Sequence, residues 1–159
     1  MEINEKVSPE KLIEFSGEHL YYEIWMLYGV TDLLLKGGQD ECVYNALLES
    51  FVIHASIIID FFYRPQVYDG DARAVHYIHD LKGWRASLPS YQKYFKEFHR
   101  KRNKEVVHLS YTRLDVPLEG KRWNARQVIK QIRRIVDRFL DQADPRLLHP
   151  KMRELRTKR

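Results

Sequence analysis

Apolar residues recur three to four positions apart along most of this chain of 159 residues, and no stretch of useful length alternates apolar with polar residues. This spacing gives each of several helices one apolar stripe, and the stripes are buried only when the helices pack together. The helical segments are long and their connections are short, which favours antiparallel neighbours. The sequence therefore predicts an all-α fold, a compact bundle of four to five helices.

Four long helices are expected, at residues 8–36, 40–63, 90–109 and 124–141, with Ser8 capping the first and Asn124 the last. The apolar stripe of the last helix is expected to face inward and comprises Val128, Ile132, Ile135, Val136 and Phe139. The second is apolar on most of its circumference and is predicted to be the most buried. Trp25 in the first helix is predicted to lie in the core. The region at residues 66–89 is looser, and only a short helix over 72–79 is expected there.

The length fits one domain, which we place at residues 1–145, followed by a basic tail at 146–159 that reads as a solvated, frayed end. The single cysteine, Cys42, excludes an internal disulfide framework and a cysteine-based zinc site. The start of the chain lacks the pattern of a secretory signal, and the longest apolar run is far below the roughly 18 residues of a membrane span. We therefore expect a cytoplasmic protein that makes no contact with membranes.

Charge is unevenly distributed along the chain. Residues 1–80 carry 5 Lys and Arg against 14 Asp and Glu, whereas residues 81–159 carry 22 against 8. A basic second half is typical of proteins that bind polyanions such as RNA. Acidic and basic helices that neutralise each other by packing side by side would give the same pattern, so charge alone leaves both interpretations open.

Arg102 is the most informative residue, because it interrupts the apolar stripe of the third helix between Phe98 and Val106. A charged side chain in that position must be paired, or it must face a cleft or an interface. Its planar guanidinium can hold a carboxylate or a phosphate by two bonds. One interpretation is therefore an internal ion pair with Glu49 or Asp60 of the second helix, and the other is a functional site.

His108 follows Arg102 by six residues, with Asn103 between them. A histidine can exchange protons near neutral pH, an arginine can stabilise charge on a phosphate, and an asparagine can orient either group. The spacing alone is weak evidence, since Arg73 and His79 repeat it. Residues six apart lie about 120° apart on an ideal helix. The pair can meet only if the helix end distorts, the arginine reaches round, or a two-fold partner supplies one member.

The residues Arg-Asn-Lys at 102–104, followed by His-Leu-Ser-Tyr-Thr-Arg at 108–113, resemble the Arg-x(4–6)-His motif of the HEPN superfamily in its Arg-Asn form. Residues 18–27 and 45–62 are similar to the corresponding helices of small bacterial HEPN-like proteins. The resemblance covers roughly residues 12–140. It implies a compact helical bundle, usually a homodimer, with the arginine and histidine of both protomers lining a cleft at the dimer interface.

The resemblance implies a metal-independent endoribonuclease, without a cofactor, that serves as a toxin or a phage-defence component. Arg102 and His108 would then be catalytic, with Asn103 as an accessory polar residue. The partners implied are RNA and a cognate antitoxin or nucleotidyltransferase. In some toxins a tyrosine two residues after the histidine is modified, but here that position is Ser110 and the tyrosine is Tyr111. Many members only bind ligands, so the alternative is a non-catalytic module for RNA, a nucleotide or a protein.

Other residues are expected to support the site. Lys101, Lys104 and Arg113 would contact RNA phosphates, and Glu49 would pair with Arg102 or Lys104. A di-iron bundle is a weaker interpretation, because it needs two Glu-x-x-His motifs and the chain has one, which ends at His108. The sequence thus names no metal ligands.

Overall fold

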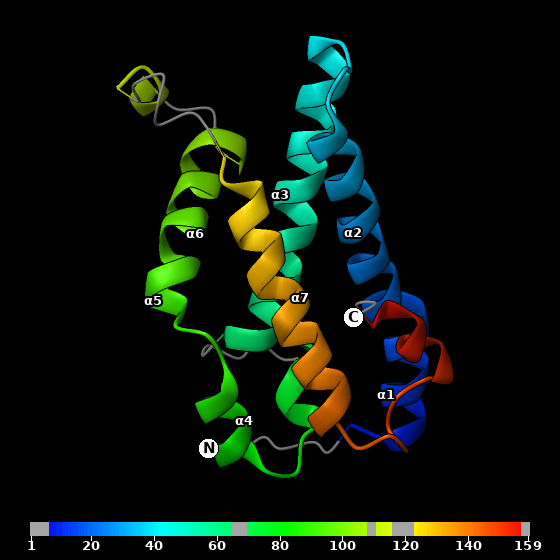
Figure 1. The fold of residues 1–159 in the computed structure, drawn as a ribbon. Helices are drawn as coiled ribbons and strands as arrows, with labels where there is room; N and C mark the ends of the chain where they lie inside the picture. Colours follow the sequence, from blue (N-terminus) through cyan, green and yellow to red (C-terminus); the bar gives the residue numbers. More distant parts are fainter. Residues whose placement is uncertain (1–6, 65–69, 108–110, 116–122, 157–159) are drawn as a thin grey trace.

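The computed structural model describes residues 7–64, 70–107, 111–115 and 123–156. Within these ranges the chain forms helices and no strand, apart from one isolated bridge between Ile78 and Ala143. The long helices run alternately up and down and pack into one bundle (Figure 1). The predicted all-α bundle is confirmed.

The first helical column is continuous from Pro9 to Lys36 but changes its winding midway. Ser8 caps it by accepting a hydrogen bond from the backbone N–H of Lys11 at 3.3 Å. A Cβ atom on Gly17 would lie 2.6 Å from Cγ of His149, so glycine permits the C-terminal segment to approach. The column consists of α1 (Pro9–Phe15), the π-helical segment η1 (Ser16–Leu20) and α2 (Tyr21–Lys36).

Helix α3 (Glu41–Tyr63) returns antiparallel to α2, and Asp40 caps it through the N–H of Val43 at 3.1 Å. By length and composition it could cross a membrane, but a buried core helix passes the same test, and 33% of its most apolar window is buried in the bundle. The prediction that this helix is the most buried is wrong. Ile53 and Ile57 are 50% and 45% exposed, because only one side of α3 meets the rest of the bundle.

The region that was expected to be loose contains more structure than its sequence suggests. The short helix expected at 72–79 is reduced to one 3₁₀ turn, η2 (Ala74–His76), and is followed by the unpredicted helix α4 (Leu81–Ser87). Asp80 caps α4 through the N–H of Gly83 at 2.9 Å. Trp84 is only 1% exposed, so burial of its indole fixes this short helix to the core.

The third column is divided rather than formed by one helix. The backbone breaks at Phe95, where φ is −122°, and the helix after the break ends in a π-helical turn. Beyond residues 108–110 the structure describes one 3₁₀ turn, η4 (Tyr111–Arg113). The elements of the column are α5 (Tyr91–Tyr94), α6 (Lys96–Arg102) and η3 (Asn103–Val107).

Helix α7 (Ala125–Gln142) packs across the other columns (Figure 1). Asn124 caps it through the N–H of Gln127 at 3.1 Å, as the sequence predicts. The ring of Phe139 lies 5.6 to 6.1 Å from aromatic rings of α3, α4 and the η2 segment, which joins these elements in one core. The predicted inward stripe is buried and comprises Val128, Ile132, Ile135, Val136 and Phe139.

The basic tail packs on the bundle and is not frayed over its described part. Segment η6 (Pro150–Leu155) buries Met152 and Leu155, with 1% and 5% exposure. The hydroxyl of Tyr21 donates to Glu154 at 3.1 Å. The sequence interpretation counted the charges of this segment and missed its two apolar anchors, so the packed chain extends to Leu155.

Candidate functional site

Arg102 is the last residue of α6, and its side chain turns toward α3. Nη1 lies 3.8 Å from Oδ2 of Asp60, and Nε donates to the side-chain oxygen of Asn103 at 3.0 Å. The side chain is 24% exposed. Of the two carboxylates that the sequence offered as partners, Asp60 is therefore the one that Arg102 meets. Glu49 is exposed, and among the described residues no cation lies within 4 Å of it.

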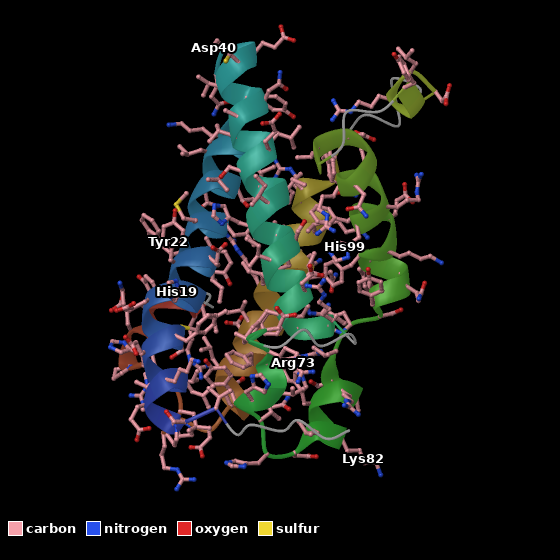
Figure 2. All side chains as sticks on the ribbon, turned by 180° about the vertical axis from the view of Figure 1, so that it is seen from behind. His19, Tyr22, Asp40, Arg73, Lys82 and His99 are labelled. Carbon is pink, nitrogen blue, oxygen red and sulfur yellow. The ribbon has the colours of Figure 1, made fainter. Side chains whose placement is uncertain are left out.

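His99 lies one turn before Arg102 and faces the same carboxylate from α6 (Figure 2). Its Nε2 is 3.7 Å from Oδ1 of Asp60, too far for a hydrogen bond. Its Nδ1 is 2.7 Å from the hydroxyl of Tyr91. The imidazole is 13% exposed, and its buried Nε2 has no hydrogen-bond partner among the described residues. Asp60 thus stands between two nitrogen groups without bonding closely to either.

The electrostatics of this cluster keep the imidazole neutral at neutral pH. Burial lowers the pKa of His99, the Asp60 carboxylate opposes that shift, and the Arg102 guanidinium adds to it. Burial and Asp60 together raise the pKa of Tyr91. The cluster therefore combines a permanent cation, a carboxylate at 3.8 Å from it and an imidazole with a lowered pKa, and Arg102 is the group in it that can bind an anion.

Asp60 also opens the cluster toward solvent. Its side chain is 34% exposed and lines a groove of about 280 Å³ between η1, the end of α3 and residues 70–73. Phe15, Ile57 and Phe61 give this groove an apolar wall, and Arg64 lines it as an ion pair with Asp71 at 3.8 Å. A ligand entering there would reach the carboxylate that pairs with Arg102.

Lys101 points away from this cluster and is 7% exposed. Its Nζ lies 3.8 Å from Glu105 and 4.6 Å from the ring centroid of Trp123, just before α7. Burial lowers the pKa of its ammonium group, and the nearby Glu105 opposes that shift. The ammonium thus ties α6 to the start of α7, and the expected contact with RNA remains a prediction.

The remaining predicted residues lie on the segment that follows α6. His108 falls outside the described residues, as does the side chain of Lys104. Arg113 is half-buried in η4, and Tyr111 beside it is 92% exposed. Of the predicted catalytic residues, the structure thus brings together Arg102 and Asn103.

Sequence reasoning missed two members of the cluster, His99 and Tyr91. The signal for His99 was present, because residues three apart in a helix are neighbours and His99 precedes Arg102 by three. Tyr91 could not be found in this way, because the break at Phe95 changes the helical register between them. Asp60 was named only as a partner that would neutralise Arg102.

Among the described residues, no group of three or more His, Cys, Asp or Glu side chains is arranged to hold a metal ion. The His76 and His79 imidazoles contact different groups: Arg73 lies 3.4 Å from His76, and Asp144 lies 2.8 Å from His79. Comparison with known proteins finds no matching family model, no matching curated protein and no matching solved structure.

Proposed function

We propose that this protein is a metal-independent endoribonuclease of the HEPN type in which Arg102 binds the scissile phosphate. The observation that carries the proposal is the incomplete pairing of a half-buried guanidinium. Oδ2 of Asp60 lies 3.8 Å from Nη1 of Arg102, and Asn103 accepts a hydrogen bond from Nε alone. A guanidinium has five donors in a planar fork, so donors remain to bind two phosphate oxygens.

The proposed reaction is attack of an RNA 2′-hydroxyl on the adjacent phosphorus. The bond between O2′ and phosphorus forms, the bond from phosphorus to O5′ breaks, and the product carries a 2′,3′-cyclic phosphate. His108 accepts the proton of the 2′-hydroxyl, and the imidazolium returns a proton to O5′. Arg102 stabilises the charge that develops on the non-bridging oxygens. Asp60 and His99 are positioning residues that fix the guanidinium.

The resemblance to HEPN proteins supports the remaining parts of the proposal. The protein acts in the cytoplasm as a homodimer and serves as a toxin or defence component, controlled by an antitoxin or a nucleotidyltransferase. A dimer gives His108 a route to Arg102 across the interface. The π-helical turn η3 gives a second route, because it distorts the end of the helix that connects the two residues.

A specific observation favours a second candidate, a binding module without catalysis. Arg102 already faces a carboxylate of its own chain, which is the arrangement expected of an arginine with a structural or ligand-binding role. In this case the cluster recognises RNA, a nucleotide or an acidic protein surface and cleaves nothing. Replacement of His108 distinguishes the two candidates, because only the nuclease needs this residue for RNA cleavage.

The test is cleavage of mixed RNA in EDTA by the parent protein, by His108→Ala and by a matched control, His79→Ala, whose side chain is 75% exposed and does not line the groove beside Asp60. The nuclease predicts cleavage by the parent and the control, with cyclic phosphate ends, and no cleavage by His108→Ala. Circular dichroism confirms that all three are folded. Absence of cleavage by the folded parent, or equal cleavage by His108→Ala, contradicts the proposal.

A further inference from the structure

The outer side of the α2–α3 pair is apolar and uncovered within the described chain. Figure 2 looks onto this side, where α3 lies in front and no described element covers its N-terminal half. Large apolar side chains on it are between 44% and 54% exposed, whereas the apolar residues of the core are at most 8% exposed. We call this surface the outer face, and its exposed members are Tyr22, Trp25, Leu33, Val43, Ile53 and Ile57.

The spacing on the outer face is that of a helix-packing surface. Exposed or half-exposed positions of α3 follow one another at intervals of three and four, at residues 43, 46, 50, 53 and 57, and those of α2 do so at 22, 26, 29 and 33. This is the interval that places side chains along one seam against another helix. The middle of the seam carries only small residues, which are Gly29, Ala46 and Ser50. A Cβ on Gly29 would meet nothing within 4 Å.

The charge around the outer face is acidic. Residues 16–63 contain seven Asp and Glu against one Lys. Glu18, Glu41 and Glu49 are exposed, and no described cation lies within 4 Å of any of them. A second copy of the same face would bring carboxylates toward carboxylates, and an anionic lipid surface would be repelled in the same way. A partner with cationic side chains beside its own apolar stripe would be complementary both to the apolar seam and to the acidic residues around it.

The bundle already packs a helix of this kind on the opposite side of the same pair. Helix α7 is basic and amphipathic, and its Arg133 lies 3.2 Å from Asp32 and 4.9 Å from the ring centroid of Tyr28. Its apolar stripe meanwhile lies against the core. The outer face repeats the apolar and acidic chemistry that holds α7 on the inner side of α2 and α3, and no helix among the described residues occupies it.

We propose that the outer face docks a cationic amphipathic helix of another protein. Exposed apolar residues fill its seam, and Glu18, Glu41 and Glu49 pair with Lys or Arg of the incoming helix. This inference does not depend on the proposed nuclease, because it uses neither Arg102 nor His108. Loss of docking and loss of cleavage are separately measurable.

The test uses a fluorescein-labelled peptide of 18 residues (a length chosen for this assay, about 27 Å as a helix) made of Leu and Lys, with Leu at heptad positions. A permuted peptide of the same composition and a Leu/Glu peptide with the same seam are the controls. We expect micromolar binding of the first peptide alone, measured by anisotropy at physiological salt. Unlabelled peptide should shift the emission of Trp25 to the blue, and Trp25→Phe should remove that shift.

Two variants test the location of the binding site. Ile53→Lys places a charge in the seam, and Gly29→Gln fills open space in a helix that tolerates glutamine better than glycine. Each should weaken peptide binding about tenfold or more, while circular dichroism stays unchanged. Lys36→Gln, which leaves the seam and the acids intact, should bind as the parent does.

Several results would overturn the proposal. The first is no binding of the Leu/Lys peptide at 100 µM, which is about the weakest affinity that a helix-in-groove contact would give. The second is equal binding of either control peptide, and the third is unchanged affinity in both seam variants. Sedimentation would reveal a second copy if self-association disappears in Ile53→Lys. Flotation with phosphatidylcholine vesicles would reveal a lipid surface if binding disappears in the same variant. Either of these last results would assign the outer face to a different occupant.

Discussion

Two carboxylates in this molecule each lie between a histidine and an arginine, and their geometries are opposite. Asp144 accepts hydrogen bonds at 2.8 to 3.2 Å from His79 and Arg146, and its side chain is 6% exposed. Asp60 lies 3.7 Å from His99 and 3.8 Å from Arg102 and is 34% exposed. The same three residue types thus form one closed cluster and one open cluster.

Burial of the cations differs in the same way. His79 and Arg146 are 75% and 82% exposed around a buried acid, whereas the imidazole and guanidinium of the Asp60 cluster are the more buried members. In the Asp144 cluster, the imidazole and the guanidinium are open to solvent and the acid is fully bonded, which serves to fix the loop after α7. In the Asp60 cluster, neither the imidazole nor the guanidinium forms a hydrogen bond to the acid. A half-buried guanidinium with unused donors is therefore the feature on which we base the proposal that the Asp60 cluster binds a ligand and the Asp144 cluster is structural.

The largest expected effect is on catalysis. Arg102→Ala should lower the rate of RNA cleavage by about 10²–10³, because it removes the donor to the phosphate oxygens. Arg146→Ala, the matched change in the closed cluster, should leave the rate unchanged. Initial rates on a labelled RNA in EDTA measure both. Equal losses in the two variants would remove the distinction between the clusters.

The second effect is on stability, and here the change in the Asp144 cluster is expected to have the larger effect. Asp144→Asn should lower the Tm clearly, because the neutral amide weakens short bonds to the Arg146 guanidinium and the His79 imidazole. Asp60→Asn should cost less than about 1 kcal/mol of unfolding free energy, because neither of its ion pairs is a hydrogen bond. Thermal and urea unfolding of both variants test this order, and a larger loss in Asp60→Asn would contradict it.

The third effect is a difference between the two clusters in how their contributions to stability depend on pH. Because burial lowers the pKa of His99 in the folded state, the unfolded chain binds more protons below the ordinary histidine pKa of about 6.5. Stability should therefore fall as the pH falls through that value, and His99→Gln should flatten the slope. Burial lowers the pKa of His76 in the same direction, so part of the slope should remain.

The closed cluster should respond in a lower pH range. Arg146 and His79 hold the pKa of the Asp144 carboxyl well below its usual range. Its contribution is present above the ordinary carboxyl pKa of about 3.9 and is lost only as the pH falls toward the folded value. Urea unfolding between pH 8 and pH 5 should therefore show the effect of His99→Gln and none from protonation of Asp144.

A small effect on stability is expected from Tyr91→Phe. This change removes the hydroxyl that contacts Nδ1 of His99 at 2.7 Å and keeps the ring that packs beside Phe95. We expect a loss of about 1 kcal/mol of unfolding free energy. Tyr111→Phe, on a side chain that is 92% exposed, should change nothing. A silent Tyr91→Phe would mean that the hydroxyl does not position His99.

Local signals were enough to predict the long helices but not their neighbours. The caps at Ser8 and Asn124 and the stripe of α7 depend on residues within a few positions, and all are confirmed. The exposure of Trp25 and Ile53 was not predictable, because an apolar helix surface does not say whether this chain or another covers it. Burial of Lys101 was missed for a similar reason, since Trp123 reaches it from the start of another helix.

The candidate site was predictable only in part. The position of Arg102 in an apolar stripe indicated an important charge and offered Asp60 as a partner. The distances that distinguish the Asp60 cluster from the Asp144 cluster depend on how α6 packs against α3, and no pattern in one segment contains that information. Sequence therefore predicted the residue at the centre of the site but not its incomplete pairing.

The central claim is that the Asp60 cluster, and not the Asp144 cluster, meets a phosphate. The most direct measurement is the ¹⁵N imidazole spectrum of the protein as an uncleavable 2′-deoxy oligonucleotide is added. The account predicts that the signals of His99 shift to saturation, that those of His79 do not move, and that Arg102→Ala abolishes the shift. Movement of His79 with a silent His99, or no movement at saturating oligonucleotide, would contradict it.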